Sequence, residues 1–338
     1  MSGTEPVLSV RDLSVAISGP DGNVDLLDRV SFDAYANEVL CIVGESGSGK
    51  SLSMMACMGM LPEAAEIVAG EILFAGRDLV TTGEAERGRV RGTGMSMVFQ
   101  DPMSALNPLM RVGAQIDETL RLHRRALSRS ERKAAVHELL RLVHIANPEA
   151  RARSYPHELS GGMRQRIMIA MAMAHRPPLL IADEPTTALD VTVQAQILAL
   201  LGEMRRDTGA AQILITHDLG VVAQVADRVV VLYSGRVVES GTVAELFHAP
   251  SHPYTVGLLA SLLRPDAGRA YAIPGQPPAA SERPSGCAFR PRCAIGADRP
   301  ECASRVPPLV SLDGSQRSAC LFPNEARAMP RLPEGRAA

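Results

Sequence analysis

The amino-acid sequence predicts an α/β protein with a mostly parallel sheet under helices, an antiparallel N-terminal part and a small cysteine-containing C-terminal extension. Three observations support this fold class. Apolar strand-like runs alternate with helix-like segments as far as about Ser240. A glycine-rich loop separates one such strand from one such helix. From about Pro250 the composition changes, and the rest of the 338-residue chain is rich in Pro, Arg and Cys.

Short apolar runs and turn residues mark the N-terminal part. Val7–Val10 and Leu13–Ile17 predict two strands, and Gly19–Asn23 carries turn residues. A helix-rich segment is expected from about Asp101 to His175, where apolar residues recur at helical spacing. The antiparallel part therefore comes first, and the helices gather in the middle of the chain.

The glycine-rich loop has the pattern Gly-x4-Gly-Lys-Ser, which cradles phosphates in nucleotide-binding proteins. It follows the apolar run Val39–Val43 and precedes the helix-like run Leu52–Leu61, which is the context that the motif requires. Backbone N–H groups of such a loop bind phosphate oxygens, the lysine bridges the outer phosphates, and the serine hydroxyl binds Mg²⁺. The loop residues are Gly44, Glu45, Ser46, Gly47, Ser48, Gly49, Lys50 and Ser51.

Two carboxylates, Asp183 and Glu184, end an apolar run that begins at Leu179. At the mouth of a parallel sheet, Asp183 suits a nucleotide-bound Mg²⁺ ion, and Glu184 suits the orientation and deprotonation of an attacking water. Alone, such a pair is better explained as a solvated strand end. Ser160–Gly162 opens an apolar helix, where the same residue types make either an anion site or a simple cap.

In kind and order, these motifs resemble those of ATP-binding subunits of ABC transporters. The resemblance also includes Gln100 after the run Met95–Phe99, the stretch Ala188-Leu189-Asp190, and His217 after the run Gln212–Thr216. It covers the whole chain. It implies an ABC-type P-loop ATPase core and a helical subdomain that docks on membrane subunits. Two such ATPases would form a head-to-tail dimer with two ATP molecules in the interface.

The resemblance implies a role for each site residue. Glu184 is expected to be the catalytic base, His217 to hydrogen-bond the γ-phosphate, and Gln100 to report the nucleotide state to the membrane subunits. Lys50 and its loop are expected to bind the phosphates, and Ser51, Gln100 and Asp183 to bind Mg²⁺. Across the dimer, Ser160, Gly161 and Gly162 are expected to contact the γ-phosphate of the opposite site. Asp190 is expected to lie at the dimer contact.

Further motifs resemble oligopeptide and dipeptide import ATPases. They are residues 101–108 after Gln100, His-Pro-Tyr-Thr at 252–255, Ile-Pro-Gly-x-Pro-Pro at 273–278, and the cysteine-containing stretch 286–293. The resemblance implies a nucleotide-binding domain over residues 1–252, with its helical subdomain at about 101–175, and an extension over residues 253–338. We expect an ATPase that powers peptide import. Nickel importers share much of this pattern, so nickel or another small solute stays open as the substrate.

Charge and hydropathy restrict the partners. Lys plus Arg is 35 and Asp plus Glu is 37, giving a net charge of −2 without the basic surplus that nucleic acid requires. No apolar run approaches 18 residues and no secretory signal opens the chain. We expect a peripheral protein on the cytoplasmic side of the inner (plasma) membrane. The resemblance implies two transmembrane permease subunits, a second ATPase subunit in a heterodimer, and an extracytoplasmic binding protein. A soluble ABC ATPase acting on nucleic acid or ribosomes, or a subunit that binds ATP without hydrolysis, is less favoured.

Of six cysteines, Cys41 and Cys57 fall in predicted core segments. Four widely spaced thiols in the extension suit a [4Fe–4S] cluster, and the resemblance indicates the same group. Zinc favours Cys-x2-Cys pairs and a cytosolic chain disfavours disulfides, but zinc and free thiols stay open. We expect loss of the cluster by Cys293→Ser to disorder the extension and to leave the nucleotide site intact. The four residues are Cys287, Cys293, Cys302 and Cys320.

Overall fold

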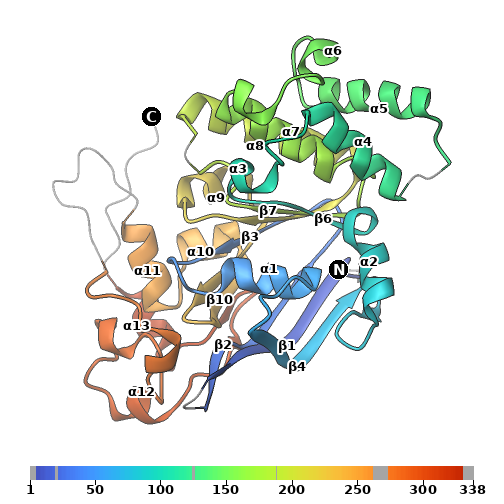
Figure 1. Cartoon of the computed structure of the whole chain (residues 1–338). Coiled ribbons are helices and arrows are strands. Elements are labelled where there is room, and N and C mark those ends of the chain that lie inside the picture. Colours follow the sequence, from blue (N-terminus) through green and yellow to red (C-terminus); the bar gives the residue numbers. More distant parts are fainter. Residues whose placement is uncertain (1–4, 20–21, 124–125, 188, 262–272, 330–338) are drawn as a thin grey trace, which may run out of the picture. The chain divides into compact units, whose positions relative to one another are not determined.

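The computed structural model describes residues 5–19, 22–123, 126–187, 189–261 and 273–329, and Figure 1 follows these elements along the chain. The chain forms two compact units, each made of several segments of the sequence. The first comprises Met1–Leu8, Ala34–Glu38 and Thr81–Ile215; the second comprises Ser9–Asp33, Val39–Val80 and Thr216–Ala338. None of the helices in the described part of the chain is long and apolar enough to cross a bilayer. Positions 20 and 21 of the predicted turn, and Ala188, lie outside the described residues.

Three parallel strands form the centre of the first unit, in the order β8-β7-β6. All residues of β7 and β8 are buried, as expected for parallel strands covered on both faces, which are apolar along their whole length. Glu184 is the first residue after the carboxyl end of β7, so it directly follows a buried strand. The strands are β6 (Met95–Val98), β7 (Leu179–Asp183) and β8 (Ala211–Ile215).

The predicted helix-rich segment is present in this unit. The helices α4, α5 and α7 pack on one another (Figure 1) through buried side chains such as Ile116, Leu140 and Ile167. Ser128 and Glu131 form a capping box that begins α5. The helices of the unit are α2 (Glu84–Thr93, kinked at Arg91 and Gly92), α3 (Pro102–Ala105), α4 (Val112–His123), α5 (Arg129–Leu142), α6 (Pro148–Arg151), α7 (Gly161–Ala172) and α8 (Val191–Thr208).

The second unit begins with a sheet in the order β2-β1-β4-β5. The prediction of two separate strands at Val7–Val10 and Leu13–Ile17 was wrong, because one strand, β1, continues through both. Asp12 has a φ of 45° at the interruption, and its N–H is satisfied by the Ser31 hydroxyl at 2.8 Å. The four strands are β1 (Leu8–Gly19), β2 (Gly22–Ala34), β4 (Ala65–Phe74) and β5 (Arg77–Asp78).

Further strands of the second unit come from the core and from the C-terminal extension. β3 pairs in parallel with β9, β10 is antiparallel to β9, and β12 of the extension is antiparallel to β10 and to β11. These strands are β3 (Val39–Val43), β9 (Arg228–Tyr233), β10 (Arg236–Thr242), β11 (Val310–Ser311) and β12 (Arg317–Ser318). The helices are α1 (Lys50–Met58), α9 (Leu219–Val225), α10 (Val243–His248), α11 (Pro253–Ala260), α12 (Pro300–Ser304) and α13 (Pro323–Arg327).

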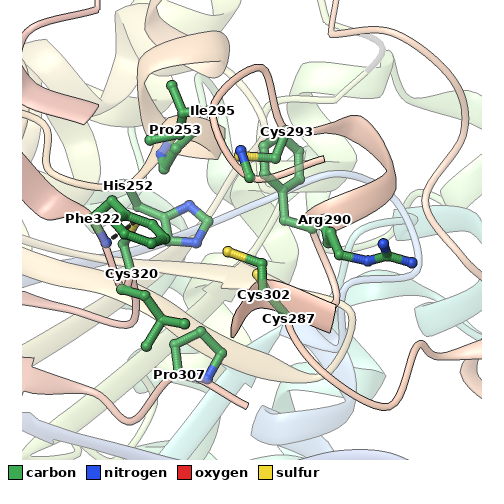
Figure 2. A pocket seen from close by; sticks show the side chains of 13 residues that line it. His252, Pro253, Cys287, Arg290, Cys293, Ile295, Cys302, Pro307, Cys320 and Phe322 are labelled. Atoms are coloured by element: carbon green, nitrogen blue, oxygen red, sulfur yellow. Dashed lines mark hydrogen bonds between the residues drawn. The ribbon is translucent and has the colours of Figure 1, made fainter. Parts of the chain in front are cut away.

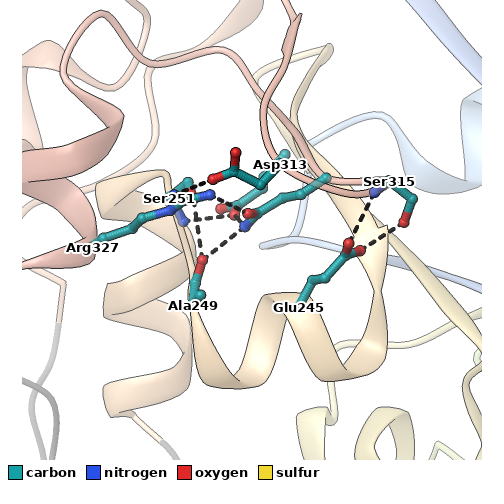
Figure 3. Close-up of polar contacts among 8 residues, drawn as sticks. Glu245, Ala249, Ser251, Asp313, Ser315 and Arg327 are labelled. Atoms are coloured by element: carbon teal, nitrogen blue, oxygen red, sulfur yellow. Dashed lines mark hydrogen bonds and ion pairs between the residues drawn. The ribbon is translucent and has the colours of Figure 1, made fainter.

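Polar contacts fasten the extension to the rest of the second unit (Figure 3). Arg327 donates to the Ser251 hydroxyl at 2.8 Å and to the side-chain oxygen of Gln316 at 2.7 Å. Glu245 accepts from the backbone N–H of Ser315 at 2.9 Å and from its hydroxyl at 2.7 Å. Hydrogen bonds thus attach the described part of the extension to the rest of this unit.

Glu239, in β10, is a completely buried carboxylate at this attachment. It accepts from the backbone N–H groups of Ser251 (2.7 Å) and His252 (2.9 Å), and from the side-chain amide of Gln316 (2.8 Å). Burial raises the pKa of Glu239 from 4.5 to about 7, while the hydrogen bonds act in the opposite direction. Its titration is therefore expected near neutral pH.

The raised pKa of Glu239 predicts a pH-dependent stability. A group whose pKa is higher in the folded state contributes stability that is full below pH 4.5 and is lost as the pH rises through about 7. Glu239→Gln removes this titration. The unfolding free energy of the wild type minus that of the variant should fall between pH 5 and 8 by about 1–3 kcal/mol. Denaturant unfolding curves across this range measure it, and parallel pH profiles would contradict the prediction.

Candidate nucleotide-binding and hydrolysis site

In the second unit, the phosphate-binding loop lies between β3 and α1, as predicted. Its first glycine, Gly44, approaches β9 so closely that an added Cβ would lie 2.2 Å from the carbonyl oxygen of Leu232. Gly49 has a φ of 100°, and a Cβ there would lie 2.5 Å from Cδ2 of Leu27. Both positions therefore require glycine for packing and backbone conformation, independently of any nucleotide.

Lys50 is the first residue of α1 and is only 5% exposed. Its Nζ donates to the carbonyl oxygens of Gly44 (2.8 Å) and Glu45 (3.0 Å), so the ammonium group folds back over the loop. Ser51 follows in the first turn of the same helix. The helix begins two residues earlier than expected and ends at Met58, because Gly59 adopts a left-handed conformation with a φ of 63°.

His217 belongs to the same unit as the loop. The N–H of Thr216 donates to the carbonyl oxygen of Ile42 in β3 at 3.3 Å, so His217 directly follows a residue bound to the strand that leads into the loop. His217 itself is exposed. Asp218 caps the next helix, α9, through bonds to the N–H groups of Gly220 and Val221. The cap fixes where the chain turns after His217.

In the first unit, the carboxylate pair lies at the end of β7. Asp183 is 4% exposed, and Glu184 has a φ of 44°, a left-handed conformation that is uncommon for a residue with a side chain. One carboxylate oxygen of Glu184 accepts from Nε2 of Gln100 at 3.0 Å and from Oγ1 of Thr187 at 2.9 Å. The structure thus brings Gln100 and Glu184 together. The sequence analysis did not single out Thr187. The pattern that could have indicated it is a hydroxyl residue three positions after the carboxylate.

The Ser-Gly-Gly motif opens α7 in the first unit. The Ser160 hydroxyl accepts from the N–H of Met163 at 3.3 Å and caps the helix. A Cβ on Gly162 would lie 2.7 Å from Cγ1 of Val193 in α8, so this glycine permits close helix packing. Asp190 caps α8 by accepting from the N–H of Val193 at 3.0 Å. These residues have local structural roles beside those that the resemblance implies.

The four cysteines of the extension line one small cavity (Figure 2). None forms a disulfide. Gly296 leaves room between two of them, because a Cβ there would lie 3.1 Å from Sγ of Cys302 and 3.2 Å from Sγ of Cys293. Burial raises the pKa of Cys287 to about 11 and that of Cys320 to about 12. As the described side chains stand, no group of three or more His, Cys, Asp or Glu residues is arranged to hold a metal ion.

A contact that the sequence did not indicate joins the extension to the phosphate-binding loop. Arg292, in the turn Arg290–Arg292, donates through Nη1 and Nη2 to both carboxylate oxygens of Glu45, at 2.6 and 3.0 Å. These bonds raise the pKa of Arg292 above its ordinary value. Because Cys293 is its neighbour in sequence, the expectation that Cys293→Ser leaves the nucleotide site intact no longer follows.

Family models match both parts of the chain. The ABC transporter model matches residues 27–187, and the model of the C-terminal region of oligopeptide/dipeptide transporters matches residues 238–302. The dipeptide transport ATP-binding protein DppD of Bacillus subtilis is 50% identical over 86% of this chain and 87% of its own length. The oligopeptide transport ATP-binding protein OppD of Salmonella typhimurium is 48% identical over 94% of each chain.

Solved structures show the same fold. A dimeric bacterial ABC transporter cassette matches with a TM-score of 0.62 and 26% identity, over 70% of this chain and 98% of that chain. The cbiO1 protein of Clostridium perfringens, part of an ABC transporter complex, matches with a TM-score of 0.62 and 28% identity, over 72% of this chain and 91% of that one. The predicted α/β ABC-type fold is confirmed. The chain belongs to the ABC transporter ATP-binding proteins, in the branch that contains the oligopeptide and dipeptide transport proteins.

Proposed function

We propose that this chain is the ATP-hydrolysing subunit of an ABC importer of oligopeptides or dipeptides. The observation that carries the proposal is the match of one chain both to the ABC cassette and to the C-terminal region of oligopeptide/dipeptide transporters. The presence of Lys50, Asp183, Glu184 and His217 favours hydrolysis over ATP binding alone.

The proposed chemistry divides the work among these residues. Lys50 and the loop amides bind the phosphates of Mg²⁺·ATP, with Ser51, Gln100 and Asp183 at the metal and its water shell. Glu184 accepts the proton of the attacking water, and the bonds from Gln100 and Thr187 hold its carboxylate in place. His217 donates to the γ-phosphate. Ser160, Gly161, Gly162 and Asp190 serve the opposite site of an ATPase dimer. Such catalysis depends on positioning and charge stabilisation.

The proposed assembly contains two transmembrane permease subunits, a second ATPase subunit and an extracytoplasmic binding protein. Within it, residues 1–252 form the nucleotide-binding domain, with the helical subdomain at about 101–175, and residues 253–338 form the extension. The chain would be a peripheral subunit at the cytoplasmic face of the inner membrane. Support comes from relatives that are named as ATP-binding proteins of dipeptide and oligopeptide transport.

The assembled transporter in proteoliposomes tests this function. ATP hydrolysis is measured with the binding protein alone, with a mixture of di- to pentapeptides, and with Ni²⁺. We expect peptide to stimulate hydrolysis and to enter the vesicles. Stimulation and uptake of nickel without any peptide response would favour the nickel alternative. ATP binding by the complex without turnover would indicate a regulatory subunit.

We propose in addition that the four cysteines of the extension hold a [4Fe–4S] cluster. Their convergence on one cavity fits four thiolate ligands. Backbone N–H groups of Gly296 and Phe322 point at the sulfurs of Cys293 and Cys320, at 3.2 and 3.4 Å. Such bonds stabilise thiolate sulfur in clusters. The side chains must adjust to bind the group, because no three or more of the described residues are now arranged to hold a metal ion. The cluster would have a structural role.

Anaerobic purification with iron and acid-labile sulfide analysis tests the cluster. We expect about four irons and four sulfides per chain, as a [4Fe–4S] cluster contains, and a broad absorption in the visible spectrum. Both should disappear in Cys302→Ser and persist in the core variant Cys57→Ser. Stoichiometric zinc without iron would rule out the cluster, and a metal-free chain with an ordered extension would rule out both metals.

A further inference from the structure

Glu45 places a negative charge inside a loop whose ligand is a polyanion. It is the second residue of the phosphate-binding loop, and its side chain is 28% exposed. An uncompensated carboxylate there would repel the phosphates of ATP, since like charges within several ångströms disfavour each other in a partly buried site. The loop therefore needs a counter-charge for this residue.

Arg292 of the extension supplies that counter-charge. Its side chain is only 4% exposed, and its guanidinium forms a two-bond fork with the Glu45 carboxylate. The guanidinium is held from other directions as well. Its Nε donates to the carbonyl oxygen of Pro274 at 2.8 Å, and it lies over the rings of Tyr233 (5.8 Å) and Phe289 (5.9 Å). A planar, fixed fork of this kind is specific to arginine.

Two further contacts join the extension to the same loop. The completely buried Tyr254 accepts, at its hydroxyl, the backbone N–H of Glu45 at 2.8 Å. Residues 276–280 of the extension and the loop segment 45–48 line the same cavity of about 340 Å³. Residues of the extension therefore contact the loop in three ways. Tyr254 binds its backbone, Arg292 binds the Glu45 carboxylate, and residues 276–280 share a cavity with it.

We propose that Arg292 is a positioning residue for ATP: by neutralising Glu45 and holding the start of the phosphate-binding loop, it lets the C-terminal extension set the affinity of the loop for nucleotide. This inference rests on the proposed function, because it concerns the same nucleotide site. It gives the extension a role in binding energetics beyond its own folding.

Binding of Mg²⁺·ATP to the full-length chain, measured by isothermal titration calorimetry, tests the proposal. Arg292→Met keeps much of the side-chain volume and removes the charge, and we expect it to raise the Kd about tenfold. The matched control is Arg299→Met. Arg299 lies in the same extension, also forks onto a carboxylate (Glu325), and also covers an aromatic ring (Phe322), without a described contact to the loop. Its Kd should stay within about twofold of the wild type.

Rescue separates charge neutralisation from packing. Glu45→Gln removes the repelling charge, so Arg292→Met combined with Glu45→Gln should bind ATP at least about threefold more tightly than Arg292→Met alone. Glu45→Gln alone completes the double-mutant cycle. A combined variant as weak as Arg292→Met, or weaker, would overturn the proposal, as would an unchanged Kd for Arg292→Met.

A second pair of variants covers the case in which Arg292→Met does not fold. If Arg292→Met does not fold, Arg292→Lys is compared with Arg299→Lys; only the first should weaken binding, by about threefold, because lysine cannot form the fork. Equal Kd values for that pair would again overturn the proposal. Failure of the wild-type chain to bind Mg²⁺·ATP would instead contradict the proposed function.

Discussion

Glu184→Gln is expected to lower steady-state ATP hydrolysis by roughly 100-fold or more, while ATP binding is retained and the closed ATPase dimer accumulates. The glutamine oxygen can still accept from Gln100 and Thr187, the two groups that bind one oxygen of the native carboxylate. The substitution therefore keeps the local contacts and removes only the basic charge that would accept a proton from water. Phosphate release by the assembled transporter measures the effect.

Glu203→Gln is the control for this experiment. Glu203 is a half-exposed carboxylate on α8 of the same unit, and we expect turnover within about twofold of the wild type after its replacement. Turnover within about tenfold of the wild type for Glu184→Gln would show that another group, or the phosphate itself, accepts the proton.

Lys50→Met should weaken Mg²⁺·ATP binding by about 100-fold, which corresponds to ~2.7 kcal/mol. A buried ammonium that bridges two phosphates makes charge-assisted hydrogen bonds worth about 1.5–3 kcal/mol each. The same ammonium donates to the carbonyl oxygens of Gly44 and Glu45, so the variant should also lose some thermal stability. Calorimetric titration and a melting curve measure the two effects separately.

The chain contains its own control, because Lys133 is the only other lysine. It is exposed on α5, and Lys133→Met should leave the Kd for ATP unchanged within about twofold. If Lys50→Met binds ATP within about threefold of the wild type, Lys50 does not contact the phosphates, and the loop binds them through its backbone alone.

The parallel strands could be predicted from sequence because burial on both faces makes them continuous apolar runs, as in β7 and β8. The antiparallel β1 was divided wrongly. The polar residues Arg11 and Asp12 interrupt its apolar pattern, whereas the Ser31 hydroxyl satisfies the N–H of Asp12 and the strand continues. When a side chain, here Ser31, takes the place of a backbone carbonyl as hydrogen-bond acceptor, the sequence shows no recognisable pattern for it.

The same limit applies to the candidate site. Glu184 could be indicated because it follows a buried strand, and Gln100 was indicated by the family resemblance; the structure joins them by a hydrogen bond. The bond between Arg292 and Glu45 spans 247 positions and belongs to no shared motif. Arg292 reaches Glu45 because it packs over Tyr233. That packing depends on the folded extension, so the sequence alone does not indicate the bond.

The pairing of β12 with β10 also bears on how the protein avoids edge-to-edge strand pairing with other molecules. One side of β10 pairs with β9, and Glu239 and Ser240 pair on the other side with Ser318 and Arg317. The outermost strand of these is then β11, which has only two residues. Short edge strands offer little template for intermolecular pairing, whereas a bare seven-residue β10 would offer a long one. A chain cut before residue 310 should therefore be prone to aggregation through this strand, even where its nucleotide-binding residues are all present.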